Sequence, residues 1–113
     1  MRPVTLVLNK DFKRLYYRGT NVVLPSVVIY FQKNRLGFNR YGITTSKKIG
    51  NAVARNRARR VIFEAYRNLL PKINTGYDFV FVARGKTVFT KSTAVQKALE
   101  SALTKNGLMI NKV

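Results

Sequence analysis

Four arginines stand close together in the middle of the chain, at Arg55, Arg57, Arg59 and Arg60. The apolar residues around them recur at α-helical spacing, which predicts a helix with one buried side and one cationic side. Guanidinium groups are planar, permanently charged donors that suit phosphate oxygens. We therefore interpret this helix, together with Lys47 and Lys48 just before it, as a surface that binds a polyanion.

The alternative for a charged helix face is a solvated surface with no partner. Solvated faces usually mix charges of both signs, whereas no Asp or Glu occurs between Asp11 and Glu64. The whole chain has 22 Lys and Arg against four Asp and Glu, giving a formal net charge of +18. Self-repulsion on that scale destabilises a compact chain, which favours a polyanionic partner: nucleic acid first, an anionic membrane second.

The chain offers few groups for catalysis by the protein itself. It contains no His and no Cys, which removes common general bases, nucleophiles and metal ligands. Its four carboxylates are Asp11, Glu64, Asp78 and Glu100. No two of them have the spacing of a local metal motif, and Glu64 is placed to pair with Arg60 and Arg67 on the helix. The sequence predicts no catalytic and no metal-binding set on the protein.

A second group of residues is aromatic. Phe12 and Tyr16 stand at positions i and i+4 of an expected helix, and Tyr30 shares one face of an expected strand with Val28. Aromatic rings beside basic residues suit base stacking by single-stranded nucleic acid. Taken alone, however, the residues favour packing of Phe12 and Tyr16 against a sheet. Phe63 lies among the cationic residues, and both edge packing and stacking on a ligand stay open for it.

The hydrophobic pattern and its breakers predict the elements that position these residues. We expect a helix at about 10–18, strands at 20–24, 26–32 and 40–45, the central helix from 51 to Pro71, a strand at 78–83 and a helix at 92–106. Asn9 and Asn51 are the expected N-caps. The strands at 26–32 and 40–45 would be antiparallel if they form a hairpin. This α-β-β-β-α-β-α order predicts one α+β domain spanning residues 1–113.

Length and composition place limits on the class of protein. With 113 residues, 46% of them hydrophobic, the chain suits one domain with a single core. The N-terminal apolar run is too short for a signal peptide, and no apolar run approaches the ~20 residues of a membrane span. We therefore expect a cytoplasmic protein.

The segment S-K-K-I-G-N-A-V-A-R-N-R-A-R-R at residues 46–60 resembles the signature of the protein subunit of bacterial ribonuclease P. The hallmark of that family is an Arg-Asn-Arg core, here residues 55–57, followed by further basic residues. Three flanking stretches are similar as well: Asn9 to Phe12, Arg18-Gly19 and Asp78 to Arg84. The resemblance covers roughly residues 8–104.

The resemblance implies a fold and a function that composition does not. The family has one α+β domain with a mixed four-stranded sheet and a left-handed β-α-β crossover around the central helix, although crossovers are generally right-handed. Its holoenzyme is an endoribonuclease, a hydrolase that removes the 5′ leader from precursor tRNA. The catalyst is an RNA with bound Mg²⁺, and the protein is an accessory. The implied partners are the catalytic RNA subunit and precursor tRNA, with no membrane and no obligate protein partner.

The resemblance also assigns roles to residues. The family's basic helix faces the catalytic RNA, and the matching positions are Lys47, Lys48, Arg55, Asn56, Arg57, Arg59 and Arg60. The family binds the single-stranded leader between the first helix and the sheet, and the matching positions are Phe12, Tyr16, Val28 and Tyr30. Many members carry a basic residue where this chain has Phe63.

Other functions compete with a ribonuclease P subunit. The main alternative is a structural RNA-binding protein of ribosomal type with no processing role. An autonomous nuclease and a module that binds duplex DNA are two further alternatives. The effect of the protein on leader cleavage by a matching catalytic RNA separates the first interpretation from the others.

Overall fold

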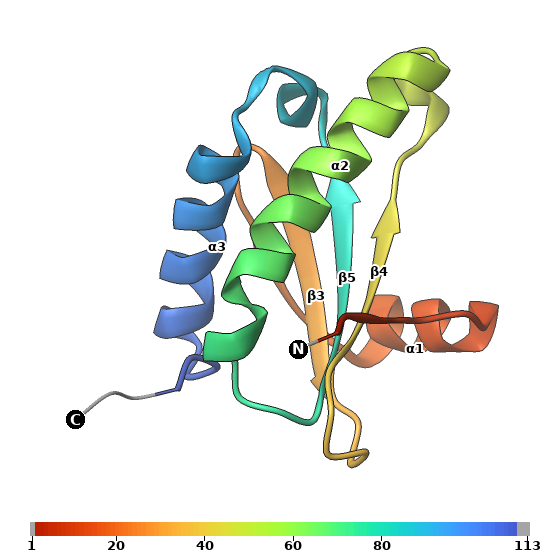
Figure 1. Ribbon diagram of the computed structural model, residues 1–113. Coiled ribbons are helices and arrows are strands. Elements are labelled where there is room, and N and C mark those ends of the chain that lie inside the picture. The colour runs from red at the N-terminus through yellow and green to blue at the C-terminus, as the bar shows by residue number, and fades with distance from the viewer. Residues whose placement is uncertain (1, 111–113) are drawn as a thin grey trace.

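A mixed five-stranded sheet organises the chain in the computed structural model, which describes residues 2–110 (Figure 1). The strands, in spatial order, are β1 (Val4–Thr5), β4 (Arg40–Thr44), β5 (Tyr77–Ala83), β3 (Val27–Lys33) and β2 (Thr20–Val23). The α+β class predicted from the sequence is confirmed. The sheet has five strands and not four, because a two-residue segment of the extended N-terminus pairs in parallel with β4.

The order of the strands differs from the expected hairpin. β3 and β4 do not pair with each other, because β5 lies between them. The central strand β5 is antiparallel to β3, with Val80 opposite Tyr30, and parallel to β4, with Val80 opposite Gly42. Residues on both faces of β5 are buried, which suits a strand at the centre of a sheet covered on both sides.

The helix α2 (Ala52–Leu69) connects the parallel strands β4 and β5. In Figure 1 both strands point upward, α2 lies in front of the sheet, and β5 stands to the left of β4. A right-handed crossover would place β5 to the right of β4. The connection is therefore left-handed, against the general rule, and the crossover expected around the central helix is confirmed.

Helices cover both faces of the sheet. The alternation of side chains along β3 directs Val27, Ile29 and Phe31 into a core shared with α2 and α3 (Ser92–Lys105). Val28 and Tyr30 lie on the opposite face, on which α1 (Asn9–Arg18) packs together with Leu6 of the preceding segment. The basic helix and Tyr30 of β3 are thus on opposite sides of one sheet.

The two expected N-caps have different outcomes. Asn51 caps α2 as predicted, because its Oδ1 accepts a hydrogen bond of 2.9 Å from the Ala54 backbone N–H. Asn9 is instead the first residue of α1, and Leu8 occupies the cap position without a side-chain hydrogen bond. No helix within residues 2–110 is both long enough and apolar enough to cross a membrane.

Candidate nucleic-acid interface

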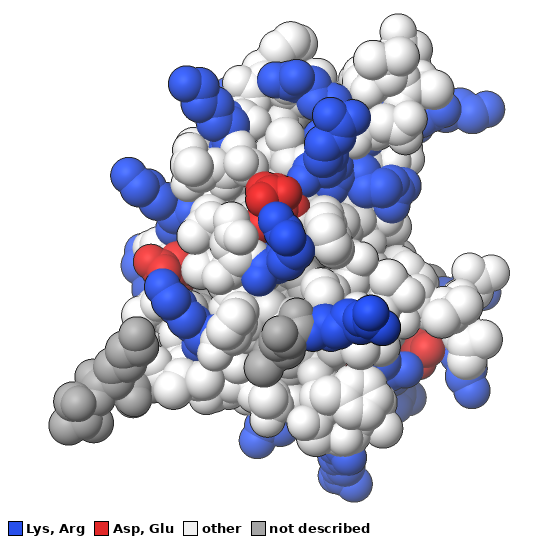
Figure 2. Space-filling view, viewed as in Figure 1, with Lys and Arg blue, Asp and Glu red and all other residues white. Residues whose placement is uncertain are grey.

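The cationic residues predicted to face RNA lie on α2 and on the short 3₁₀ helix η1 (Lys47–Ile49) that precedes it. Six of the seven predicted positions are exposed, and Arg55 is half-buried. Figure 2, viewed as in Figure 1, shows Lys and Arg side chains over this part of the molecule with few acidic ones among them. Glu64 pairs with Arg67 at 2.7 Å. The predicted second pair, with Arg60, is not formed.

Arg57 and Arg59 are held in place by neighbouring backbone. Arg59 Nη1 donates to the Ile43 carbonyl of β4 at 2.8 Å, and its Nη2 donates to a threonine hydroxyl in the following loop at 3.0 Å. Arg57 Nε donates to the Val88 carbonyl at 2.8 Å. Each guanidinium has five N–H donors, so both groups keep donors for a ligand while their orientation is fixed.

Arg60 differs from these two arginines. It is exposed, and it forms no hydrogen bond or ion pair with any other residue in the range 2–110. Lys47 and Lys48 are exposed in the same way on η1. These three side chains are exposed to solvent without a partner in the described residues, whereas Arg57 and Arg59 also bond neighbouring segments of the fold.

The aromatic residues predicted to bind the leader lie on the face covered by α1. The Tyr16 and Tyr30 rings meet edge to face with centroids 5.1 Å apart. Tyr16 is 40% exposed, and Val28 and Tyr30 are half-buried. Phe12 packs farther along, over β4, where a Cβ at Gly42 would come within 2.5 Å of its ring. Tyr16 and Tyr30 are therefore in direct contact, Val28 shares the β3 face of Tyr30, and Phe12 lies apart from them over β4.

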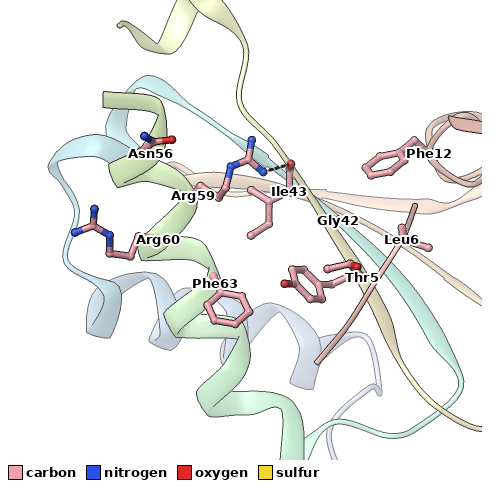
Figure 3. Close-up of a pocket in the computed structure, with 10 residues that line it drawn as sticks. Thr5, Leu6, Phe12, Gly42, Ile43, Asn56, Arg59, Arg60 and Phe63 are labelled. Atoms are coloured by element: carbon pink, nitrogen blue, oxygen red, sulfur yellow. Dashed lines mark hydrogen bonds between the residues drawn. The ribbon is translucent and has the colours of Figure 1, made fainter. Parts of the chain in front are cut away.

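A groove connects the two regions around the edge of β4. It has a volume of about 710 Å³ and is lined by residues from β1, α1, β4 and α2. Figure 3 shows Phe63, Arg59 and Asn56 on the α2 side and Leu6 and Phe12 on the opposite side. The sequence did not identify Tyr41 and Gly42 as part of it. The glycine inside a strand was a usable signal, because such glycines mark close approach of another group.

A buried ion cluster anchors α1 to the sheet. Asp78 has no exposed surface and accepts hydrogen bonds from Arg40 at 2.7 and 2.9 Å, from Arg14 of α1 at 2.6 Å and from Asn34 at 2.8 Å. Burial raises the pKa of Asp78, but the hydrogen bonds from Arg40, Asn34 and Arg14 outweigh it, so the net pKa is below its usual value. The sequence placed Asp78 only at a strand start and missed this role.

The same carboxylates do not suit Mg²⁺. Asp11 and Asp78 share the partners Arg14 and Arg40, so guanidinium groups already occupy the oxygens that a hard cation would need. No group of three or more acidic side chains comes together within residues 2–110.

Comparison with known proteins decides the family. The family model described as Ribonuclease P matches residues 1–107. The chain belongs to the ribonuclease P family. The resemblance drawn from residues 46–60 is confirmed.

Relatives within the ribonuclease P family are close in sequence. The chain is 43% identical over 98 residues to the ribonuclease P protein component of Thermoanaerobacter sp. (strain X514), covering 87% of this chain and 84% of the relative. It is 40% identical over 103 residues to the ribonuclease P protein component of Caldanaerobacter subterraneus subsp. tengcongensis, covering 91% of this chain and 89% of the relative.

Solved structures of ribonuclease P proteins share the fold. The Staphylococcus aureus protein superposes with a TM-score of 0.81 at 30% identity, over 95% of this chain and 98% of that one. The Thermotoga maritima protein superposes with a TM-score of 0.79 at 28% identity, over 92% of this chain and 97% of that one. The topology described above, including the crossover around α2, is therefore that of the family.

Proposed function

We propose that this protein is the RNA-binding component of a cytoplasmic ribonuclease P, in which it assists a catalytic RNA in the endonucleolytic removal of the 5′ leader from precursor tRNA. The observation that carries the proposal is the placement of two different surfaces on opposite faces of one sheet. Exposed cations lie on α2 and η1, and half-exposed aromatic rings lie between α1 and β3. One surface suits phosphates and the other suits unpaired bases.

The cationic surface is proposed to bind the catalytic RNA. Lys47, Lys48 and Arg60 supply charge that no residue in the range 2–110 neutralises. Arg57 and Arg59 supply donors in fixed orientations, because backbone carbonyls hold their side chains. Binding of this kind depends on counterion release, so affinity should fall steeply with salt.

The aromatic surface is proposed to bind the single-stranded leader. Tyr16 is exposed at the edge of α1 and contacts Tyr30, and Val28 continues the same face of β3. Stacking on such rings contributes about 1–3 kcal/mol per base without strong sequence preference. That tolerance suits leaders of varied sequence.

Mg²⁺ is proposed to bind mainly to the RNA partner. The carboxylates that lie near each other in the protein are occupied by arginines. The protein would favour Mg²⁺ binding indirectly, because its cations reduce the repulsion between RNA phosphates that oppose the folded RNA. The chemistry of hydrolysis would belong to the RNA and its metal ions.

Reconstitution tests this proposal. Cleavage of a leader-bearing precursor tRNA by the catalytic RNA of a Thermoanaerobacter ribonuclease P is measured against Mg²⁺ concentration, with and without this protein. The protein should lower the Mg²⁺ concentration for half-maximal cleavage several-fold. RNA binding without any change in the Mg²⁺ requirement would support the ribosomal-type alternative. Cleavage by the protein in the absence of catalytic RNA would support an autonomous nuclease.

A further inference from the structure

The groove beside β4 lies at an open edge of the sheet. β1 pairs with β4 at Arg40 and Tyr41, and beyond Tyr41 no strand within residues 2–110 lies beside this edge of β4. At Gly42 the edge also has no side chain, and the groove of about 710 Å³ passes over it (Figure 3). Pockets of a few hundred Å³ to about 1,000 Å³ are typical of sites that hold small ligands.

Two aromatic rings form one wall of this groove. Phe63 of α2 and Tyr41 of β4 lie with centroids 5.6 Å apart at an angle of 42°. Both are half-buried, so each ring keeps an open part. Burial raises the pKa of the Tyr41 hydroxyl, with Arg59 opposing the shift, and the hydroxyl is therefore a protonated donor at neutral pH. The wall offers apolar area with one polar group.

The rim of the groove is cationic. Arg59 and Arg60 lie on it beside Asn56, and none of the residues that line the groove is acidic. Arg59 is fixed to the Ile43 carbonyl, but Arg60 is without a partner in the part of the chain that the structure describes. Asn56 is exposed, and an amide can pair with the edge of a base.

We propose that this groove holds one unstacked nucleotide of an RNA strand, with its base against Phe63 and Tyr41 and its phosphate at Arg60. An aromatic wall beside an unpaired guanidinium fits the two parts of a nucleotide, the flat base and the anionic phosphate. An apolar peptide segment would cover the wall but leave Arg60 unpaired. The proposal gives a role to Phe63, which the family motif leaves without one. It rests on the proposed function only for the source of the RNA.

Direct binding to the isolated protein tests the site itself. The probes are the trinucleotide ApApA and the same trinucleotide with an abasic middle position, each titrated against the isotope-labelled full chain by NMR. ApApA should shift the resonances of the Phe63 and Tyr41 rings and of the Arg60 side chain, and the abasic probe should shift the two rings much less. Shifts confined to Tyr16 and Tyr30, or shifts of the Phe63 and Tyr41 rings that are equal for both probes, would overturn the proposal.

A matched pair of variants sharpens the test. Phe63→Leu keeps an apolar side chain but removes the ring, and it should weaken ApApA binding at the groove about tenfold, consistent with the loss of one stacked base. Phe89→Leu is the control, since Phe89 is 88% exposed and lies outside the groove. Equal effects of the two substitutions would contradict a base-binding groove. The wild-type shifts decide the question even if Phe63→Leu folds poorly.

Two further arms identify the source of the nucleotide. One measures the affinity of wild type and Phe63→Leu for the catalytic RNA alone. The other measures the affinity of the assembled enzyme for leader-bearing and leaderless tRNA. A loss in the first arm assigns the nucleotide to the catalytic RNA, and a loss restricted to leader-bearing tRNA assigns it to the leader. No loss of affinity in either arm would overturn the nucleotide site proposed in the groove. It would leave the proposed function standing, because Mg²⁺-dependent cleavage tests that function separately.

Discussion

The two faces of the sheet differ in how completely helices cover them. The face under α2 and α3 is closed, and Ile29, Phe79 and Phe81 have no exposed surface there. The face under α1 is covered by a single ten-residue helix, which leaves Tyr30 and Val82 half-buried. On the closed face α2 and α3 lie between the sheet and any partner, and the outer side of α2 carries charge. On the open face the sheet itself is accessible, and it carries rings.

The contrast teaches that phosphate binding and base binding can be altered separately in this protein. Removing a cation from α2 or η1 leaves the α1 side untouched, and removing a ring from α1 leaves the cationic side untouched. Anchoring also differs between the faces. Apolar burial holds α2 and α3, whereas the small α1 core is supplemented by the ion pairs Arg14–Asp78 and Arg40–Asp11.

The largest expected effect comes from breaking the anchor of α1. Asp78→Asn removes the buried charge that Arg14 and Arg40 share, and we expect a loss of about 3 kcal/mol in the free energy of unfolding. Urea denaturation measures it. The control is Glu64→Gln, which breaks an exposed pair with Arg67 and should cost less than about 0.5 kcal/mol. Equal losses would show that the buried cluster is not an anchor.

The same cluster predicts how stability depends on acid. The folded-state pKa of Asp78 is lowered, so its contribution is complete above the unfolded-state pKa of about 3.9 and is lost as pH falls through the folded value. Unfolding free energy measured below about pH 4 should therefore fall less steeply in Asp78→Asn than in wild type. Parallel curves for the two proteins would contradict the assignment of this titration to Asp78.

The next effect concerns the open face. Tyr16→Ala removes a ring that is 40% exposed and contacts Tyr30. It should weaken binding of leader-bearing precursor tRNA to the assembled enzyme about tenfold, because one stacking platform is lost, and leave leaderless tRNA unchanged. Phe12→Ala should act in the same direction but also cost stability, since Phe12 packs on Gly42. Equal losses for both tRNAs would restore the interpretation that these rings only pack the core.

The smallest of these effects concerns the closed face. The Tyr66 hydroxyl is buried, and it has no hydrogen-bond partner within residues 2–110. Tyr66→Phe should therefore raise the free energy of unfolding by about 1 kcal/mol, because an unsatisfied buried hydroxyl is unfavourable. RNA binding should not change. A lower urea midpoint for the variant would show that the hydroxyl is hydrogen-bonded in solution.

Patterns of neighbouring residues predicted the helices and most strands well. Features that depend on contacts between residues far apart in sequence were missed. The spacing around Arg55 to Arg60 and the cap at Asn51 specify α2 from neighbouring residues alone. Nothing local specifies that β5 inserts between β3 and β4, because strand order depends on contacts far apart in sequence. The family motif supplied the fold handedness and the residue list for both surfaces. It did not indicate that Arg59 donates a hydrogen bond to the Ile43 carbonyl. It also did not indicate that Asp78 connects α1 and β4 through Arg14 and Arg40.

A crossed measurement on the assembled enzyme tests most directly whether the two faces have separate functions. Lys47→Ala/Lys48→Ala and Tyr16→Ala are compared in two assays: the salt dependence of affinity for the catalytic RNA, and the affinity ratio between leader-bearing and leaderless tRNA. The double-lysine variant should reduce the log–log salt slope by about one to two units and leave the ratio unchanged. Tyr16→Ala should lower the ratio about tenfold and leave the slope unchanged. If either variant alters both quantities to a similar extent, the two faces do not have separate functions.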